Sequence, residues 1–156
     1  MDAPPLAELQ AFIVDAKRQT YVGGGTPATP LRPASHDLEF SAGEFRYHDT
    51  YFGGTDFVGE EVVYWRGSPV WAENYFGHIL RPELLTAERS GQVIKSSRSR
   101  MYSENRFLGG FETADGDCTY HDASTGDAAW FQGREWIDRA GETAYELYYH
   151  GGLIRD

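Results

Sequence analysis

The stretch from Ser35 to Gly77 alternates aromatic and polar residues, and glycine-containing turns divide it into short runs. Successive side chains of a β-strand point to opposite faces of the sheet. One face of each run therefore collects aromatic residues around a carboxyl group, which is Asp49 in EFRYHDTYF, Glu61 in FVGEEVVYW and Glu73 in VWAENYFG. Period-two alternation with turns this short predicts antiparallel strands.

A carboxyl group on an aromatic face is costly to bury unless it is hydrogen-bonded, and burial raises its pKa. Ligand pockets and general acid/base sites are commonly built from such groups. The pattern therefore predicts a binding or catalytic site on this sheet, without naming a reaction.

The sequence predicts a single α+β domain over residues 1–156. Its sheet is expected to be antiparallel and strongly bent, with about seven strands in a meander that forms a cup or half-barrel. We find no internal repeat in the sequence. The expected strands lie at about 37–41, 44–52, 57–66, 69–78, 117–122, 128–138 and 143–150.

Two helices are expected to flank these strands. An N-terminal helix at about 5–21 has apolar residues at helical spacing and should end at Gly23, Gly24 and Gly25. A second helix at about 82–95, in the middle of the chain, should begin at Pro82. A proline-rich loop of about ten residues after the first helix is long enough to cover the mouth of a pocket.

The net charge of −10 argues against nucleic acid as a partner, because phosphate contacts dominate that affinity. The one basic island, at 81–106, is interpreted as a solvated helix face. No apolar run is long enough for a membrane span, and the first residues do not have the pattern of a signal peptide. The single cysteine, Cys118, fits a reducing compartment, so we expect a cytoplasmic protein.

Glu61 is the first candidate for a general base. It shares a face with Phe57, Val63 and Trp65, whereas Glu60 would point the other way. A β-bulge at Gly59 would reverse this assignment, and both glutamates would be solvated if they lie at a strand end.

Asp49 and His36 are the candidates for a second proton carrier. Asp49 shares a strand face with Tyr47 and Tyr51, and the alternative for it is a surface position beside a turn. His36 precedes the first strand of the sheet, where Ser35 and Asp37 on either side of it are equally typical of a turn.

The residues expected to shape a substrate pocket are mostly aromatic, with a few polar side chains among them: Tyr47, Tyr51, Glu60, Trp65, Trp71, Asn74, Tyr75, Trp130 and His150. No zinc-type spacing and no nucleotide-binding glycine loop is found, so we expect neither a metal nor a cofactor.

The phrases YVGGG, SHDLEF, YHDTYFGGTDFVGEEVVYWRGSPVWAENYFG, WFQGREWI and YHGGLI resemble an uncharacterised bacterial and archaeal family, a domain of unknown function. The resemblance covers residues 9–154. Some members of that family carry the domain behind an XRE-type helix-turn-helix, which has no counterpart here. The resemblance implies a portable domain that senses or transforms a small molecule, and it assigns no catalytic residues.

Three functions are left open by the sequence. The first is an acid/base enzyme that needs no cofactor, such as an isomerase, cyclase, lyase or hydrolase. The second is a module that binds a ligand or partner without chemistry. The third is an interaction role in which exposed aromatic residues bind another copy of the chain, as in a homodimer.

Overall fold

The computed structural model describes residues 3–22 and 25–156, so the expected helix end at Gly23 and Gly24 lies outside the described residues. The first half contains α1 (Leu6–Lys17), the π-helix η1 (Arg18–Val22), β1 (Thr26–Pro27), β2 (His36–Ala42), β3 (Phe45–Gly53), β4 (Phe57–Trp65) and β5 (Ser68–Ile79). The second half contains α2 (Ala87–Tyr102), β6 (Phe111–Asp115), β7 (Cys118–Asp127), β8 (Trp130–Arg139) and β9 (Glu142–Leu153).

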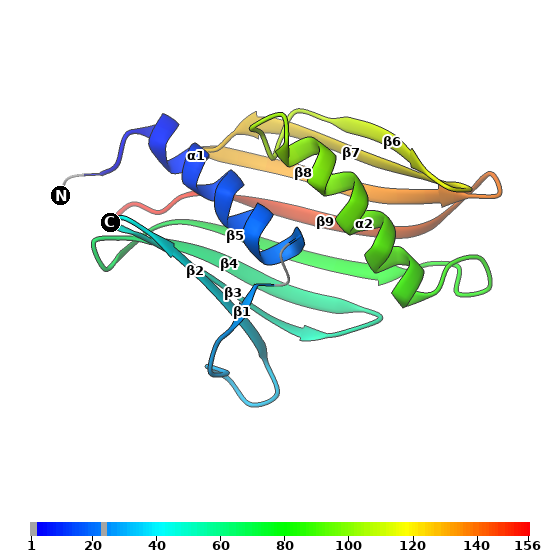
Figure 1. Ribbon diagram of the computed structural model, residues 1–156, viewed down its shortest axis with the longest axis horizontal. Helices are drawn as coiled ribbons and strands as arrows, with labels where there is room; N and C mark the ends of the chain where they lie inside the picture. Colours follow the sequence, from blue (N-terminus) through cyan, green and yellow to red (C-terminus); the bar gives the residue numbers. More distant parts are fainter. Residues whose placement is uncertain (1–2, 23–24) are drawn as a thin grey trace.

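The strands form one open antiparallel sheet in the order β1-β2-β3-β4-β5-β9-β8-β7-β6. Each half of the chain is a meander, and the two meanders join where β5 pairs with β9. Both helices lie across the same face of the sheet (Figure 1), which we call the inner face. The α+β class and the antiparallel sheet are therefore confirmed, with nine strands instead of about seven.

The additional strands lie in segments whose own pattern is weak. β1 has only two residues, inside the expected loop, and it pairs with Leu38 and Glu39 of β2. β6 is a short polar edge strand, and β7 continues through residues 123–127, beyond the end of the strand expected at about 117–122. Pairing with neighbouring strands holds these segments extended, which a local pattern does not reveal.

The second helix begins and ends later than expected. Thr86 is its N-cap, and the Thr86 side chain accepts a hydrogen bond from the backbone N–H of Arg89 at 3.1 Å. Pro82 lies in the preceding loop, and the polar segment from Ser96 onward is helical up to Tyr102. The inner side of this helix carries small and polar residues among few apolar ones, so its amphipathic signal in the sequence is weak.

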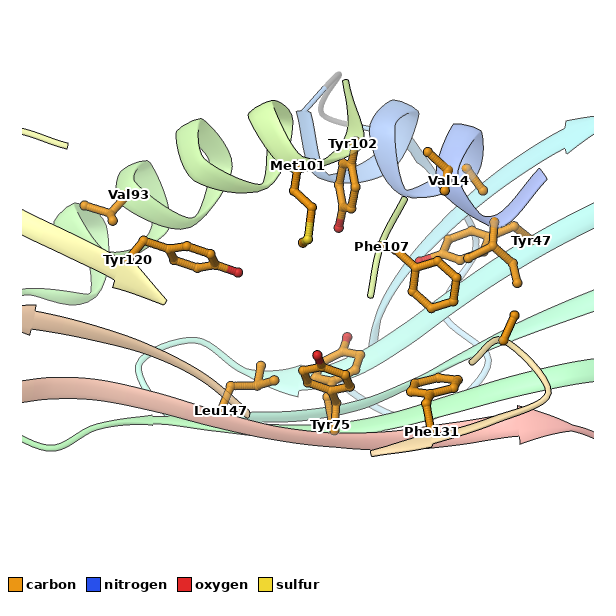
Figure 2. Packing of buried hydrophobic residues seen from close by; sticks show 14 of the residues in the cluster. Val14, Tyr47, Tyr75, Val93, Met101, Tyr102, Phe107, Tyr120, Phe131 and Leu147 are labelled. Carbon is orange, nitrogen blue, oxygen red and sulfur yellow. The ribbon is translucent and has the colours of Figure 1, made fainter. Parts of the chain in front are cut away.

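The hydrophobic core lies between the helices and the inner face of the sheet. Figure 2 shows Val14, Met101 and Tyr102 pointing from the helices toward Tyr75 and Phe131 on the strands. Leu9, Phe12, Ile13 and Ala16 of α1 are all buried here, which confirms the expected apolar stripe of this helix. The outer face of the sheet carries no helix among the described residues (Figure 1).

The two halves of the chain repeat one another, contrary to the expectation of no internal repeat. Each half is a helix followed by a four-stranded meander, β2–β5 in the first and β6–β9 in the second. Tyr-His-Asp at 47–49 recurs at 120–122, and Phe-x-Gly-x-Glu at 57–61 recurs at 131–135. Tyr75 pairs directly with its counterpart Tyr149, so a pseudo-two-fold axis passes between β5 and β9.

Backbone irregularities repeat as well. The register shifts between Val63 and Tyr64 in β4 and at the equivalent place, between Ile137 and Asp138, in β8. Gly53, the last residue of β3, and Gly126, the last but one of β7, have φ values of 90° and 91°. The sequence identity between the halves is confined to a few separated positions, which explains why the repeat is hard to recognise without the structure.

Candidate functional site

Three carboxyl groups lie side by side on the inner face of the first half. Asp49 of β3 is paired with Glu61 of β4, and Glu61 is paired with Glu73 of β5. Their relative exposures are only 2%, 1% and 4%. The register is regular through Gly59, so Glu61 points inward and Glu60 outward. Carboxyl groups as deeply buried as these need a partner, a proton or a ligand.

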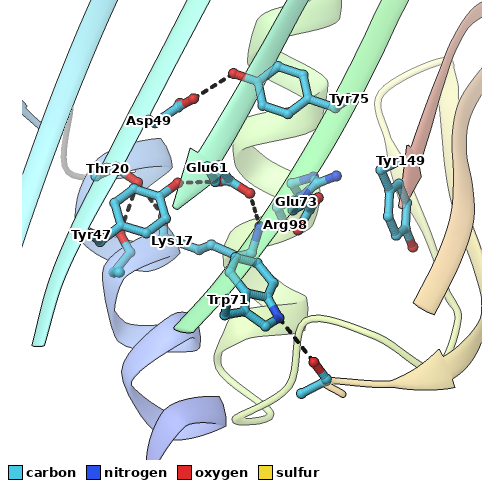
Figure 3. A network of polar contacts seen from close by, with 12 residues as sticks. Lys17, Thr20, Tyr47, Asp49, Glu61, Trp71, Glu73, Tyr75, Arg98 and Tyr149 are labelled. Atoms are coloured by element: carbon cyan, nitrogen blue, oxygen red, sulfur yellow. Dashed lines mark hydrogen bonds and ion pairs between the residues drawn. The ribbon is translucent and has the colours of Figure 1, made fainter. Parts of the chain in front are cut away.

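Lys17 at the end of α1 is the cation of this cluster. Its Nζ donates hydrogen bonds to Glu61 Oε2 at 2.6 Å and to Glu73 Oε2 at 3.0 Å (Figure 3). Burial alone would lower the pKa of Lys17, but Glu61 and Glu73 outweigh it and raise this pKa above its usual value. Lys17 is therefore charged and fixed in place by two carboxylates.

The charge of Lys17 affects the pKa values of its two partners, Glu61 and Glu73, to different extents. Burial would raise the pKa of Glu61, but Lys17 outweighs burial, and a hydrogen bond donated by the Tyr47 hydroxyl adds to its effect. The pKa of Glu61 is consequently held below its usual value. Burial raises the pKa of Glu73 to about 7, because Lys17 opposes it only in part and Glu61 adds to it. Glu61 is thus ionised near neutral pH, while Glu73 is partly protonated.

Asp49 has no cation of its own. The Tyr75 hydroxyl donates to Asp49 Oδ1 at 2.7 Å, and Oδ2 has no hydrogen-bond partner among the described residues. Burial and then the negative charge of Glu61 raise the pKa of Asp49 to about 8. At neutral pH this carboxyl group is mainly protonated, and it can give a proton to a neighbouring molecule or take one back.

A cavity of about 540 Å³ lies beside Asp49. Its walls come from β2–β5, from β9, from the C-terminal end of the α1–η1 segment and from the first half of α2, and they include Thr20, Tyr21, Tyr51, Phe57, Tyr75 and Tyr145. The volume is in the range of small-molecule sites, and aromatic side chains around one carboxyl group are typical of them. Glu88 and Lys95 of α2 also line the cavity and are exposed, so they lie at its mouth.

The second half repeats this network with changes. Arg98 of α2 takes the place of Lys17 and donates to Glu135 Oε1 at 2.8 Å, and Tyr120 donates to the same oxygen at 2.7 Å. Tyr149 donates to Asp122 Oδ1 at 2.6 Å, as Tyr75 does to Asp49. Burial raises the pKa of Asp122 to about 6. Asp122 does not line the cavity, so the two halves differ in access to this carboxyl group.

The structure brings three of the predicted site residues to the cavity, namely Asp49, Tyr51 and Tyr75. Glu61, Tyr47 and Trp71 point inward but lie in the core behind the cavity wall. The Trp71 indole N–H, for example, donates to the carbonyl oxygen of Ala128 at 3.0 Å.

The other predicted residues lie away from the cavity. Glu60, Asn74 and His150 are neighbours on the outer face, because they alternate with inward-pointing residues of β4, β5 and β9. Trp130 is 63% exposed at the start of β8, and Trp65 lies beyond the register shift at Val63, at the opposite end of β4 from Phe57. His36 is exposed and its ring lies 4.9 Å from that of Tyr51, outside the cavity lining.

Sequence reasoning did not identify the cations or the second set of carboxyl groups. Lys17 continues the apolar stripe of Leu9 and Ile13 at a spacing of four residues, which is a usable signal for a buried lysine. Arg98 belongs to the basic island at 81–106 that was interpreted as solvated, yet it is 95% buried. The equivalence of Arg98 to Lys17 becomes apparent only when the two halves of the structure are aligned.

Among the described residues, no group of three or more His, Cys, Asp or Glu side chains is arranged so that it could hold a metal ion. Within the same residues, no helix is long and apolar enough to cross a membrane. A family model described as a domain of unknown function (DUF5680) matches residues 49–154. No curated protein and no solved structure matches the chain. The match begins at Asp49 and includes the strands that carry Glu61, Glu73 and Tyr75.

Proposed function

The chain belongs to the DUF5680 family of domains of unknown function, and we propose that it is a small-molecule enzyme that transfers protons with side chains alone. The substrate would occupy the cavity beside Asp49, inside a cup formed by the sheet and the two helices. Asp49 would be the catalytic acid and base. The reaction classes that need only this equipment are isomerisation, cyclisation, lysis and hydrolysis.

The observation that carries the proposal is the state of Asp49. This side chain is 2% exposed, its pKa is raised to about 8 and its Oδ2 has no hydrogen-bond partner among the described residues. A catalytic acid or base works best when its pKa is near the working pH. Asp49 meets this condition at the wall of a cavity large enough for a substrate.

The neighbouring residues Glu61 and Tyr75 support this role by acting on Asp49. Glu61, which the sequence favours as general base, keeps its negative charge in the ion pair with Lys17 and raises the pKa of Asp49 from behind the cavity wall. Tyr75 donates to Asp49 Oδ1 and so orients the carboxyl group. We therefore assign Glu61 and Tyr75 as positioning residues and Asp49 as the catalytic residue.

A ligand-binding module without chemistry is the second candidate. It is favoured by the fact that Asp49 is the only buried carboxyl group among the residues that line the cavity, whereas many acid/base enzymes use two. In this case Asp49 and Tyr75 would recognise a polar group of the ligand, and no product would form.

The test is mass spectrometry of a metabolite extract incubated with catalytic amounts of the protein. We expect one compound to be depleted while another appears in equal amount, and we expect Asp49→Asn to abolish this turnover. Asp122→Asn is the matched control, because it neutralises the equivalent buried carboxyl group outside the cavity and should leave turnover intact. An unchanged extract, together with a small molecule retained by the protein in native mass spectrometry, would favour the binding module instead.

A further inference from the structure

We infer that the group recognised by Asp49 is a basic nitrogen, so that the ligand is an organic amine or ammonium with an apolar body. This inference rests on the proposed small-molecule site and names the chemical class that the site takes. It is carried by the distribution of charge on the inner face and by the aromatic wall of the cavity.

The inner face holds more buried carboxyl groups than buried cations. Lys17 forms ion pairs with Glu61 and Glu73, and Arg98 forms an ion pair with Glu135. Asp49 shares neither cation through a hydrogen bond, and Asp49 itself lines the cavity. A positive charge brought by a ligand would therefore supply the partner that this carboxyl group lacks within the described part of the chain.

The cavity wall is suited to a positive charge. Tyr21, Tyr51, Phe57, Tyr75 and Tyr145 line it, and the faces of such rings attract ammonium groups. Tyrosine hydroxyls can also accept hydrogen bonds from an N–H donor. Lys95, the one cation among the lining residues, is exposed at the mouth and is accompanied there by Glu88. Among the described residues, the interior of the cavity thus presents acceptors and aromatic rings without a competing cation.

The proton balance of binding depends on the kind of nitrogen. A neutral amine takes the proton of Asp49, so that the O–H bond breaks, an N–H bond forms on the nitrogen lone pair, and an ammonium–carboxylate pair results. A permanently charged ammonium cannot take that proton, so Asp49 must release it to solvent. The charged and titratable groups that surround Asp49 during either step are Lys17, Tyr21, Tyr47, Tyr51, Glu61, Glu73, Tyr75, Glu88, Lys95 and Tyr145.

The test compares phenyltrimethylammonium with tert-butylbenzene, its uncharged carbon isostere, in a binding titration followed by NMR of the intact protein. At about pH 9, where Asp49 is ionised, we expect the cation to bind at least about tenfold more tightly than the isostere. Below about pH 8 the affinity for the cation should fall by up to about tenfold per pH unit, with release of about one proton on binding.

Asp49→Asn should remove this preference for the cation, while Asp122→Asn should keep it. Retained amide chemical shifts in both variants would show that each is folded. Equal affinities for the two probes in the wild-type protein, or an unchanged preference in Asp49→Asn, would overturn the inference. If such a result were found together with Asp49-dependent turnover in the extract, the proposal of an enzyme would be supported, but its substrate would belong to another chemical class. A cation preference without turnover would instead identify an amine-binding module.

Discussion

Asp49 is the residue on which the candidate site depends, because it is an acid that the fold keeps protonated near neutral pH. Its position on β3 places it between the ion pair of Glu61 with Lys17 and an open cavity. Glu61 supplies a fixed negative charge, and Tyr75 supplies one hydrogen bond. The electrostatic properties of the site therefore come from a few neighbouring side chains whose removal has measurable effects.

The raised pKa of Asp49 predicts a specific dependence of stability on pH. Asp49 titrates at about 8 in the folded protein and at about 4 in the unfolded chain, so the folded state binds more protons between these values. The stability contributed by Asp49 is complete below about pH 4 and is lost as the pH rises toward 8. Compared with Asp49→Asn, the wild-type free energy of unfolding should fall with pH by up to about 1.4 kcal/mol per unit.

Urea unfolding of both proteins at several pH values from about 5 to 9 measures this difference. The raised pKa values of Glu73 and Asp122 also make stability depend on pH, so the wild-type profile is compared with that of Asp49→Asn and not interpreted alone. Parallel profiles for the wild type and Asp49→Asn would show that Asp49 has an ordinary pKa in the folded protein.

Lys17 predicts a large loss of stability when its charge is removed. Lys17→Met keeps most of the side-chain volume but leaves Glu61 and Glu73 buried without their cation. We expect a loss of about 3–5 kcal/mol in the free energy of unfolding, as for other broken buried ion pairs. The loss should increase with pH, because both glutamates must then be protonated in order to stay buried.

Lys95→Met is the control for this substitution. It removes a lysine that is exposed at the cavity mouth, and its effect should stay within about 0.5 kcal/mol. Urea unfolding at pH 7 would measure both variants, and a loss below about 1 kcal/mol in Lys17→Met would contradict the role given to this ion pair.

At the level of elements, the position of Tyr75 in the cavity wall depends on the glycine that lies opposite it, where β4 pairs with β5. Gly59 of β4 lies opposite Tyr75 of β5, and a Cβ added at Gly59 would come within 2.4 Å of the Tyr75 hydroxyl oxygen. Gly133 and Tyr149 repeat this arrangement in β8 and β9, at 2.3 Å from the ring. Glycine at both positions gives the tyrosine side chain room to lie over the neighbouring strand.

Alanine at these two glycines should separate stability from binding. Gly59→Ala and Gly133→Ala should each lower the free energy of unfolding by about 1–3 kcal/mol, because a tyrosine has to move. Only Gly59→Ala should also weaken binding of phenyltrimethylammonium, since it displaces Tyr75 from Asp49 and from the cavity wall. Thermal unfolding and the NMR titration measure the two effects, and equal binding by both variants would argue against a role for Tyr75 in the site.

The elements also show which features could be predicted from the sequence. The bounds of β2–β5 agree with the alternation of aromatic and polar residues to within about two residues, because glycine turns mark their ends. The same alternation predicted that Asp49, Glu61 and Tyr75 share a face. The contact of Lys17 with Glu61 could not be predicted in this way, because it depends on where α1 crosses the sheet.

The whole molecule consists of two related halves, and the cavity lies where α2 and β9 of the second half meet β2–β5 of the first. The counterparts Lys17 and Arg98 both hold a buried glutamate, and the hydrogen bonds of Tyr75 to Asp49 and of Tyr149 to Asp122 recur as well. The halves differ at Tyr51, which lines the cavity and corresponds to Ser124, and at Glu73, which corresponds to Leu147. Asp49 lines the cavity and Asp122 does not, so we interpret access to this carboxyl group as the difference on which function depends. The duplication escaped sequence analysis because its identities are separated by differing residues.

The axis between Tyr75 and Tyr149 gives the fold an evolutionary meaning. A polypeptide of half this length, one helix followed by four strands, would leave the edge of its last strand unpaired, and two such copies would rebuild the sheet as a symmetrical pair. That ancestor would have had two identical pockets. After fusion into one gene, the two halves can mutate independently. One half can then change its ligand specificity while the other keeps the residues that stabilise the fold.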